Sequence, residues 1–150
     1  MLREKINEDL KLAMKARDER RTSTLRMVNA AFKNAEIELR AQNKQLGDEE
    51  LLGLLQKMVK QRQESVEMYL KGGRAELADA EREEIAIIQG FLPQQMPEEQ
   101  VRAAIAEIIA QENATGVKDM GKVMAALKAA FAGRMDFGKA SGLVKGMLAG

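Results

Sequence analysis

The chain has 150 residues and carries 24 Lys or Arg against 23 Asp or Glu, a formal net charge of +1. This length suits one domain, or one domain with a small appendix, and allows a packed core. The absence of Cys and His excludes a disulfide framework and the Ser-His-Asp and Cys-His catalytic arrangements. We therefore expect no metal and no cofactor, while enzymes that use Lys, Asp, Glu or Ser stay formally open.

The N-terminal segment lacks the features of a targeting sequence. Glu4, Glu8 and Asp9 already place three acids among the first nine residues, and no apolar stretch follows. No run of about 18 apolar residues predicts a transmembrane helix. From these features we expect a soluble protein in the cytoplasm that makes no membrane contact.

The first part of the chain predicts four helices, because strong helix formers dominate and apolar residues recur every three or four positions. The predicted ranges are about 2–17, 18–45, 49–71 and 74–91. Asp18 is expected to cap the second helix. In the first helix, the inward face is expected to hold Leu2, Ile6, Leu10, Ala13 and Met14. The fold class predicted is all-α.

Both prolines of the chain, Pro93 and Pro97, mark a boundary. We expect an N-terminal four-helix unit at 1–92 and a small C-terminal three-helix domain at 97–150. The predicted helices of the small domain span about 97–112, 119–133 and 136–149, with Asp119 and Asp136 as N-caps. Its methionines are interpreted as core packing rather than as a partner-binding surface: Met120, Met124, Met135 and Met147.

Charged residues interrupt the apolar stripes of the third and fourth helices. Arg62 lies where an apolar residue is expected, and Glu81 does so in the next helix, with Glu84 beside it. Arg62 is therefore expected to pair with Glu81 or Glu84. We interpret the pair as structural, fixing the register of two helices; a catalytic carboxylate tuned by a guanidinium is the alternative.

The end of the chain is basic, since residues 113–150 hold six Lys or Arg and two Asp. Such a surface could meet a phosphate backbone. The segment 116–123 fits most of a P-loop, but Val123 stands where a hydroxyl must reach Mg²⁺. We interpret this segment as a glycine-containing turn between helices.

Several segments, in this order, resemble the GatB/YqeY family. They are Leu25-Arg26-Met27-Val28-Asn29-Ala30-Ala31-Phe32-Lys33-Asn34-Ala35-Glu36-Ile37-Glu38, Lys60-Gln61-Arg62-Gln63-Glu64-Ser65 with Tyr69 and Gly73-Arg74, Glu81-Arg82-Glu83-Glu84-Ile85 with Phe91-Leu92-Pro93, Asp119-Met120-Gly121-Lys122-Val123-Met124 and Gly133-Arg134-Met135-Asp136. The resemblance implies an all-helical protein similar to the tail of the B subunit of the glutamine-dependent tRNA amidotransferase. That enzyme is a carbon–nitrogen ligase with glutamine as amido-N-donor, and its catalysis lies outside the tail.

The resemblance implies RNA contacts by the matching basic residues of the small domain, which are Lys118, Lys122, Arg134 and Lys139. Arg26 and Lys33 match the second-helix motif of the family, and the resemblance assigns no contact to either residue. The first hypothesis is thus a non-catalytic tRNA-binding accessory module. The alternative is a helical helper that docks to an aminoacyl-tRNA synthetase or an amidotransferase. A third, an enzyme with Glu81 or Glu84 as acid or base, stays open, as does the oligomeric state.

Overall fold

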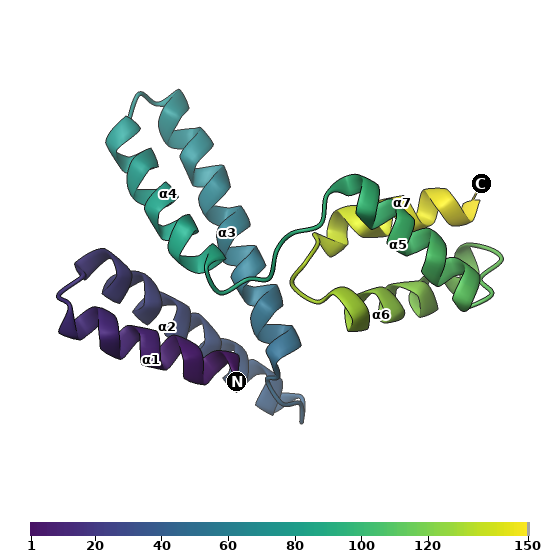
Figure 1. The fold of residues 1–150 in the computed structure, drawn as a ribbon, viewed down its shortest axis with the longest axis horizontal. Helices are drawn as coiled ribbons and strands as arrows, with labels where there is room; N and C mark the ends of the chain where they lie inside the picture. Colours follow the sequence, from purple (N-terminus) through teal and green to yellow (C-terminus); the bar gives the residue numbers. More distant parts are fainter. Residues whose placement is uncertain (150) are drawn as a thin grey trace. The chain divides into compact units, whose positions relative to one another are not determined.

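The computed structural model describes residues 1–149, which form seven α-helices and one short 3-10 helix. No strand occurs within these residues, which confirms the all-α class. The helices gather into two compact units, Met1–Pro93 and the remainder from Gln94 onward (Figure 1). Whether these units correspond to separate domains with the predicted limits of 1–92 and 97–150 stays a prediction.

The N-terminal unit consists of two helical hairpins (Figure 1). One pairs α1 (Leu2–Lys15) with α2 (Glu19–Ala41), and the other pairs α3 (Asp48–Lys71) with α4 (Ala75–Gln89). Their apolar stripes merge into one core, whose buried members are Ile6, Leu25, Val28, Phe32, Leu51, Leu55, Met58, Val59, Ile88 and Phe91. This shared core holds the two hairpins together by burial of apolar surface.

Short polar contacts set the ends of these helices. Asp18 accepts a hydrogen bond from the Arg21 N–H at 3.1 Å, so the predicted cap of α2 is confirmed. Glu50 accepts from the Gly47 N–H at 3.0 Å and satisfies a backbone donor at the start of α3. Gly73 follows α3 with a φ of +71°, a left-handed conformation that suits glycine at a helix end.

Two helix ends and one inward residue differ from the prediction. The helices α1 and α2 end before 17 and 45, because Arg17 and Asn43 adopt left-handed φ values of 58° and 59°. Met14 was expected to face inward but is 49% exposed, so that prediction is wrong. Its sulfur lies 4.0 Å from Nη2 of Arg26, on a lateral face of the hairpin.

The C-terminal unit packs three α-helices and one 3-10 turn. They are α5 (Glu98–Gln111), η1 (Val117–Asp119), α6 (Met120–Phe131) and α7 (Phe137–Ala149). The buried core comprises Val101, Ile105, Ile108, Val123, Leu127, Met135, Ala140, Val144 and Leu148. Met120, Met124 and Met147 pack against it while partly buried, which confirms their interpretation as core residues.

The segment that leads into α5 is fastened to the turn between α6 and α7. The Gln95 side-chain amide donates to the Gly133 carbonyl at 2.6 Å, and the Met96 N–H donates to the Arg134 carbonyl at 2.9 Å. Arg134 Nε donates to the Gln94 carbonyl at 3.2 Å. Gly133 itself is buried and has a φ of +77°. The turn between α6 and α7 therefore holds the segment before α5 in place within the small unit.

Candidate functional site

The four basic residues expected to contact RNA lie at two ends of one helix. Lys118 is in η1 and Lys122 is in the first turn of α6, whereas Arg134 follows α6 and Lys139 is in the first turn of α7. A helix of 12 residues, the length of α6, spans about 18 Å. The structure therefore brings the four residues together only as two pairs.

At the first end, Lys118 and Lys122 are exposed around the carboxylate of Asp119. Asp119 was expected to cap α6, but its side chain makes no such bond; it accepts from the Thr115 N–H at 2.9 Å instead. That backbone hydrogen bond, another from Gly116 and the charges of the two lysines lower the pKa of Asp119. The carboxylate is thus held ionised and offsets part of the positive charge at this end.

At the second end, the two basic side chains have different surroundings. Asp136 accepts from the N–H groups of Gly138 and Lys139 at 2.9 and 3.3 Å, so its predicted role as the cap of α7 is confirmed. The guanidinium of Arg134 is directed to the Gln94 carbonyl. Lys139 is exposed and forms no ion pair within residues 1–149. Lys139 is therefore available to a ligand, whereas the guanidinium of Arg134 already holds the α6–α7 turn against the segment before α5.

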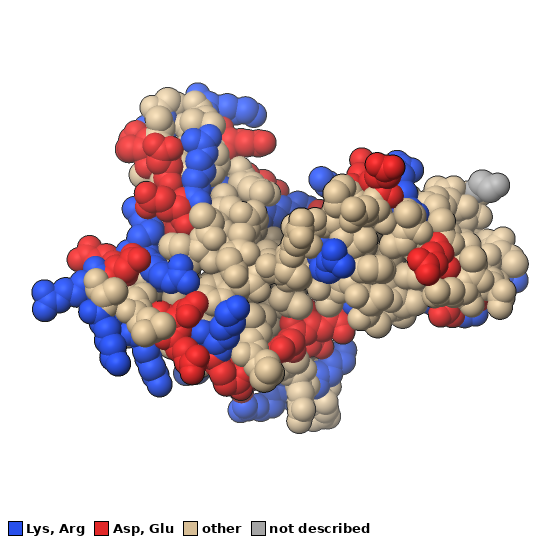
Figure 2. Space-filling model, in the orientation of Figure 1, with Lys and Arg blue, Asp and Glu red and all other residues tan. Residues whose placement is uncertain are grey.

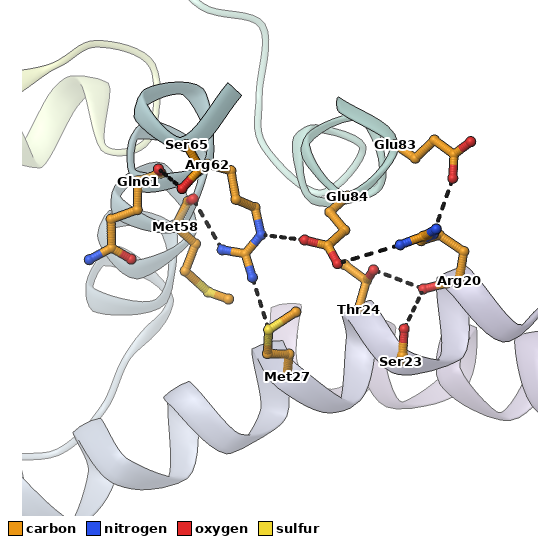
Figure 3. A network of polar contacts seen from close by, with 10 residues as sticks. All are labelled: Arg20, Ser23, Thr24, Met27, Met58, Gln61, Arg62, Ser65, Glu83 and Glu84. Atoms are coloured by element: carbon orange, nitrogen blue, oxygen red, sulfur yellow. Dashed lines mark hydrogen bonds and ion pairs between the residues drawn. The ribbon is translucent and has the colours of Figure 1, made fainter. Parts of the chain in front are cut away.

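A second polar cluster lies in the N-terminal unit, where α2, α3 and α4 meet (Figure 3). Arg62 Nε lies 3.0 Å from Glu84 Oε2, and the two side chains are only 12% and 16% exposed. Arg62 also donates to the Met58 carbonyl at 3.2 Å and approaches the sulfur of Met27 at 3.0 Å. Of the two partners left open for Arg62, the structure places Glu84 in direct contact.

Arg20 approaches the same carboxylate from α2, on the side opposite Arg62 (Figure 3). Its Nη1 lies 3.9 Å from Glu84 Oε1, and its Nε lies 3.1 Å from Glu83 Oε2. Sequence reasoning missed Arg20, because no local spacing links a base at the start of α2 to an acid 64 positions later in α4. Two guanidiniums around one carboxylate connect the first hairpin to the second.

Glu81 lies one turn before Glu84 and differs from it in environment. Burial raises the pKa of Glu81, and so do the negative charge of Glu84 and a hydrogen bond with it, while Arg62 and Arg20 act in the opposite direction. Glu84 thus binds the guanidiniums, and Glu81 holds a proton more strongly than an ordinary glutamate does. No group of three acidic side chains that could hold a metal ion occurs among residues 1–149.

Within the part of the chain that the structure describes, no helix is long and apolar enough to cross a membrane.

The sequence was compared with known proteins. A family model described as "Yqey-like protein" matches residues 3–148. A relative from Lachancea thermotolerans, "Altered inheritance of mitochondria protein 41, mitochondrial", is 40% identical over 89 residues, which cover 59% of this chain and 46% of the relative. The protein of the same name from Eremothecium gossypii is 35% identical over 123 residues, covering 80% of this chain and 66% of the relative. The chain spans about half the length of the first of these relatives.

The names of these relatives disagree with the cytoplasmic location expected from the sequence. The cytoplasmic location inferred from the N-terminal residues is contradicted, because the curated relatives are named as mitochondrial proteins. That inference rested on the composition of the N-terminal residues alone.

The family match covers both helical units, from Arg3 in α1 to Leu148 in α7, and it agrees with the motif order noted in the sequence. The chain therefore belongs to the YqeY-like family.

Proposed function

We propose that this protein is a non-catalytic RNA-binding module with a preference for tRNA, related to the tail of the tRNA amidotransferase B subunit. The observation that carries the proposal is the exposure of Lys118 and Lys139 at opposite ends of α6, without ion-pair partners within residues 1–149. Lysine side chains in this state can replace the counterions of a phosphate backbone at little structural cost. The resemblance to the amidotransferase tail supports the tRNA preference, and a helper that docks to an aminoacyl-tRNA synthetase or an amidotransferase is the alternative.

The arrangement favours contacts to the phosphate backbone over recognition of bases. Aromatic residues make up 3% of the chain, and Phe131 and Phe137 pack against the core of the small unit. Stacking of splayed bases therefore has few side chains to use. Two basic positions beyond opposite ends of α6, a helix about 18 Å long, can instead reach separate phosphates of a folded RNA.

The test removes charge at the two ends of α6 and measures tRNA binding by the full chain. Neutralising Lys118 and Lys139 as glutamines is expected to weaken binding roughly tenfold at low salt and to reduce the salt slope by about two. Arg134 is kept, because its substitution would also break the bond to Gln94. Unchanged affinity and slope would contradict the assignment of these lysines.

A matched control comes from the same unit. Lys145 is exposed on α7, about two turns after Lys139, and belongs to neither end pair. Its change to glutamine is expected to leave tRNA affinity within about twofold of the starting protein. A loss as large as that of the Lys118 and Lys139 double variant would mean that total charge, and not these positions, determines binding.

A further inference from the structure

The lateral face of the α1–α2 hairpin carries a second group of basic residues, outside the small unit. Two sets of residues at helical spacing line this face, and together they define what is called here the α1–α2 basic face: Asn7, Lys11 and Met14 from α1, and Arg26, Asn29 and Lys33 from α2. All are exposed except Asn29, which is partly buried. Figure 2 shows Lys and Arg side chains projecting from the region of this hairpin, with Asp and Glu side chains between them.

Direct contacts show that the two sets face each other across the hairpin. Asn29 donates from Nδ2 to the side-chain oxygen of Asn7 at 3.0 Å, and Nη2 of Arg26 lies 4.0 Å from the sulfur of Met14. Lys11 lies between Asn7 and Met14 on the same side of α1, because residues three and four apart share a helix face. The cations therefore surround a central pair of amides on one continuous surface.

The cations of this face are not neutralised by acids. Within residues 1–149, neither Arg26, Lys11 nor Lys33 forms an ion pair. The next acid along α2 after Lys33 is Glu36, which is bound by both Arg3 and Arg40. Glu8 precedes Lys11 by one turn and is not paired with it. The face thus keeps its positive charge in the folded chain.

We propose that the α1–α2 basic face is a second contact surface for the phosphate backbone of RNA; this inference rests on the proposed function. Arg, Lys and Asn side chains are the usual donors to phosphate oxygens. Arg26 and Lys33 are two helical turns apart, about 10.5 Å, so they reach more than one phosphate. A protein partner fits less well, since the centres of protein interfaces are depleted of charged residues and Met14 is the one large apolar side chain among the six residues of this face.

The experiment compares two double variants of the full chain in tRNA binding over a salt series. One changes Arg26 and Lys33 to glutamine. The control changes Lys57 and Lys71, two exposed bases of α3, in the same way. The first variant is expected to bind roughly tenfold more weakly at low salt, with a salt slope smaller by about two, and the control to match the starting protein. All four positions are exposed, so circular dichroism should show unchanged helix content.

The outcomes separate this inference from the proposed function. If the starting protein binds tRNA and both double variants bind equally well, or lose affinity equally, the α1–α2 basic face is not the contact surface. In that case the small unit can still bind RNA on its own. If the starting protein binds no tRNA even at low salt, the proposed function fails and this inference fails with it.

Discussion

Arg62 of α3 and Glu84 of α4 form an ion pair with a 3.0 Å Nε–Oε2 distance, and both side chains are largely buried. The pair lies where α2 also reaches the second hairpin through Arg20. Burying two charges costs solvation, which a second guanidinium and the hydrogen bond to the Met58 carbonyl help to offset. The contact therefore aligns α3 with α4 and connects them to α2.

Removal of Arg62 is expected to destabilise the N-terminal unit. Arg62→Ala leaves Glu84 partly buried with only the more distant Arg20, which should cost about 2 kcal/mol. Urea unfolding of the full chain at neutral pH measures the change. The control is Arg82→Ala, which removes an exposed pair with Asp79 and should change stability by less than about 0.5 kcal/mol. Equal losses in both variants would contradict a special role for Arg62.

Glu81 is expected to limit stability at neutral pH. Because its folded-state pKa is raised, the stability it contributes is complete below the ordinary value of 4.5 and is lost as pH rises through the folded pKa. Glu81→Gln should therefore be more stable than the starting protein at pH 7 and equally stable near pH 4. Thermal unfolding over this pH range measures the difference, and a variant less stable at pH 7 would contradict the assignment.

Asp119 is expected to show the opposite dependence. Its lowered pKa means that its stabilisation is present above the ordinary value of 3.8 and is lost as pH falls through the folded pKa. Asp119→Asn should lower the thermal midpoint of the small unit at neutral pH, since the bond to the Thr115 N–H loses its charge. The deficit should shrink in acid. A deficit that stays constant from pH 7 to pH 3 would exclude this cause.

Two glycines offer a matched test of backbone conformation. Gly73 has a φ of +71°, so Gly73→Ala should cost roughly 1 kcal/mol although no atom crowds the new methyl group. Gly53 lies inside α3 with open space around it, so Gly53→Ala should stabilise by up to about 1 kcal/mol. Urea unfolding of both variants should give opposite signs; shifts of the same sign would contradict the assigned conformations.

Helix number and core positions were predictable because they depend on local spacing. Leu25, Val28 and Phe32 fall on one side of any α-helix, and all three are fully buried. Helix ends were less predictable. The residues before Asn43 are good helix formers, and α2 ends where Asn43 adopts a left-handed backbone conformation. Met14 has the correct spacing, but the apolar contacts of the core do not extend to it.

The functional residues were predictable only in part, because their contacts are not local. Spacing pointed to Arg62 with Glu81 or Glu84, yet nothing near Arg20 indicates its contact with α4. The basic residues of the small unit came from a family motif that says nothing about distances. Only the structure shows that they form two pairs and that Arg134 binds the Gln94 carbonyl.

The proposed RNA binding is tested most directly by measuring tRNA affinity of the full chain over a salt series. We expect log affinity to fall linearly with log salt, by about 0.7–0.9 for each phosphate neutralised. We also expect total tRNA to be preferred over duplex DNA of equal charge. No binding at low salt, or equal binding of tRNA and duplex DNA, would contradict a tRNA-binding module.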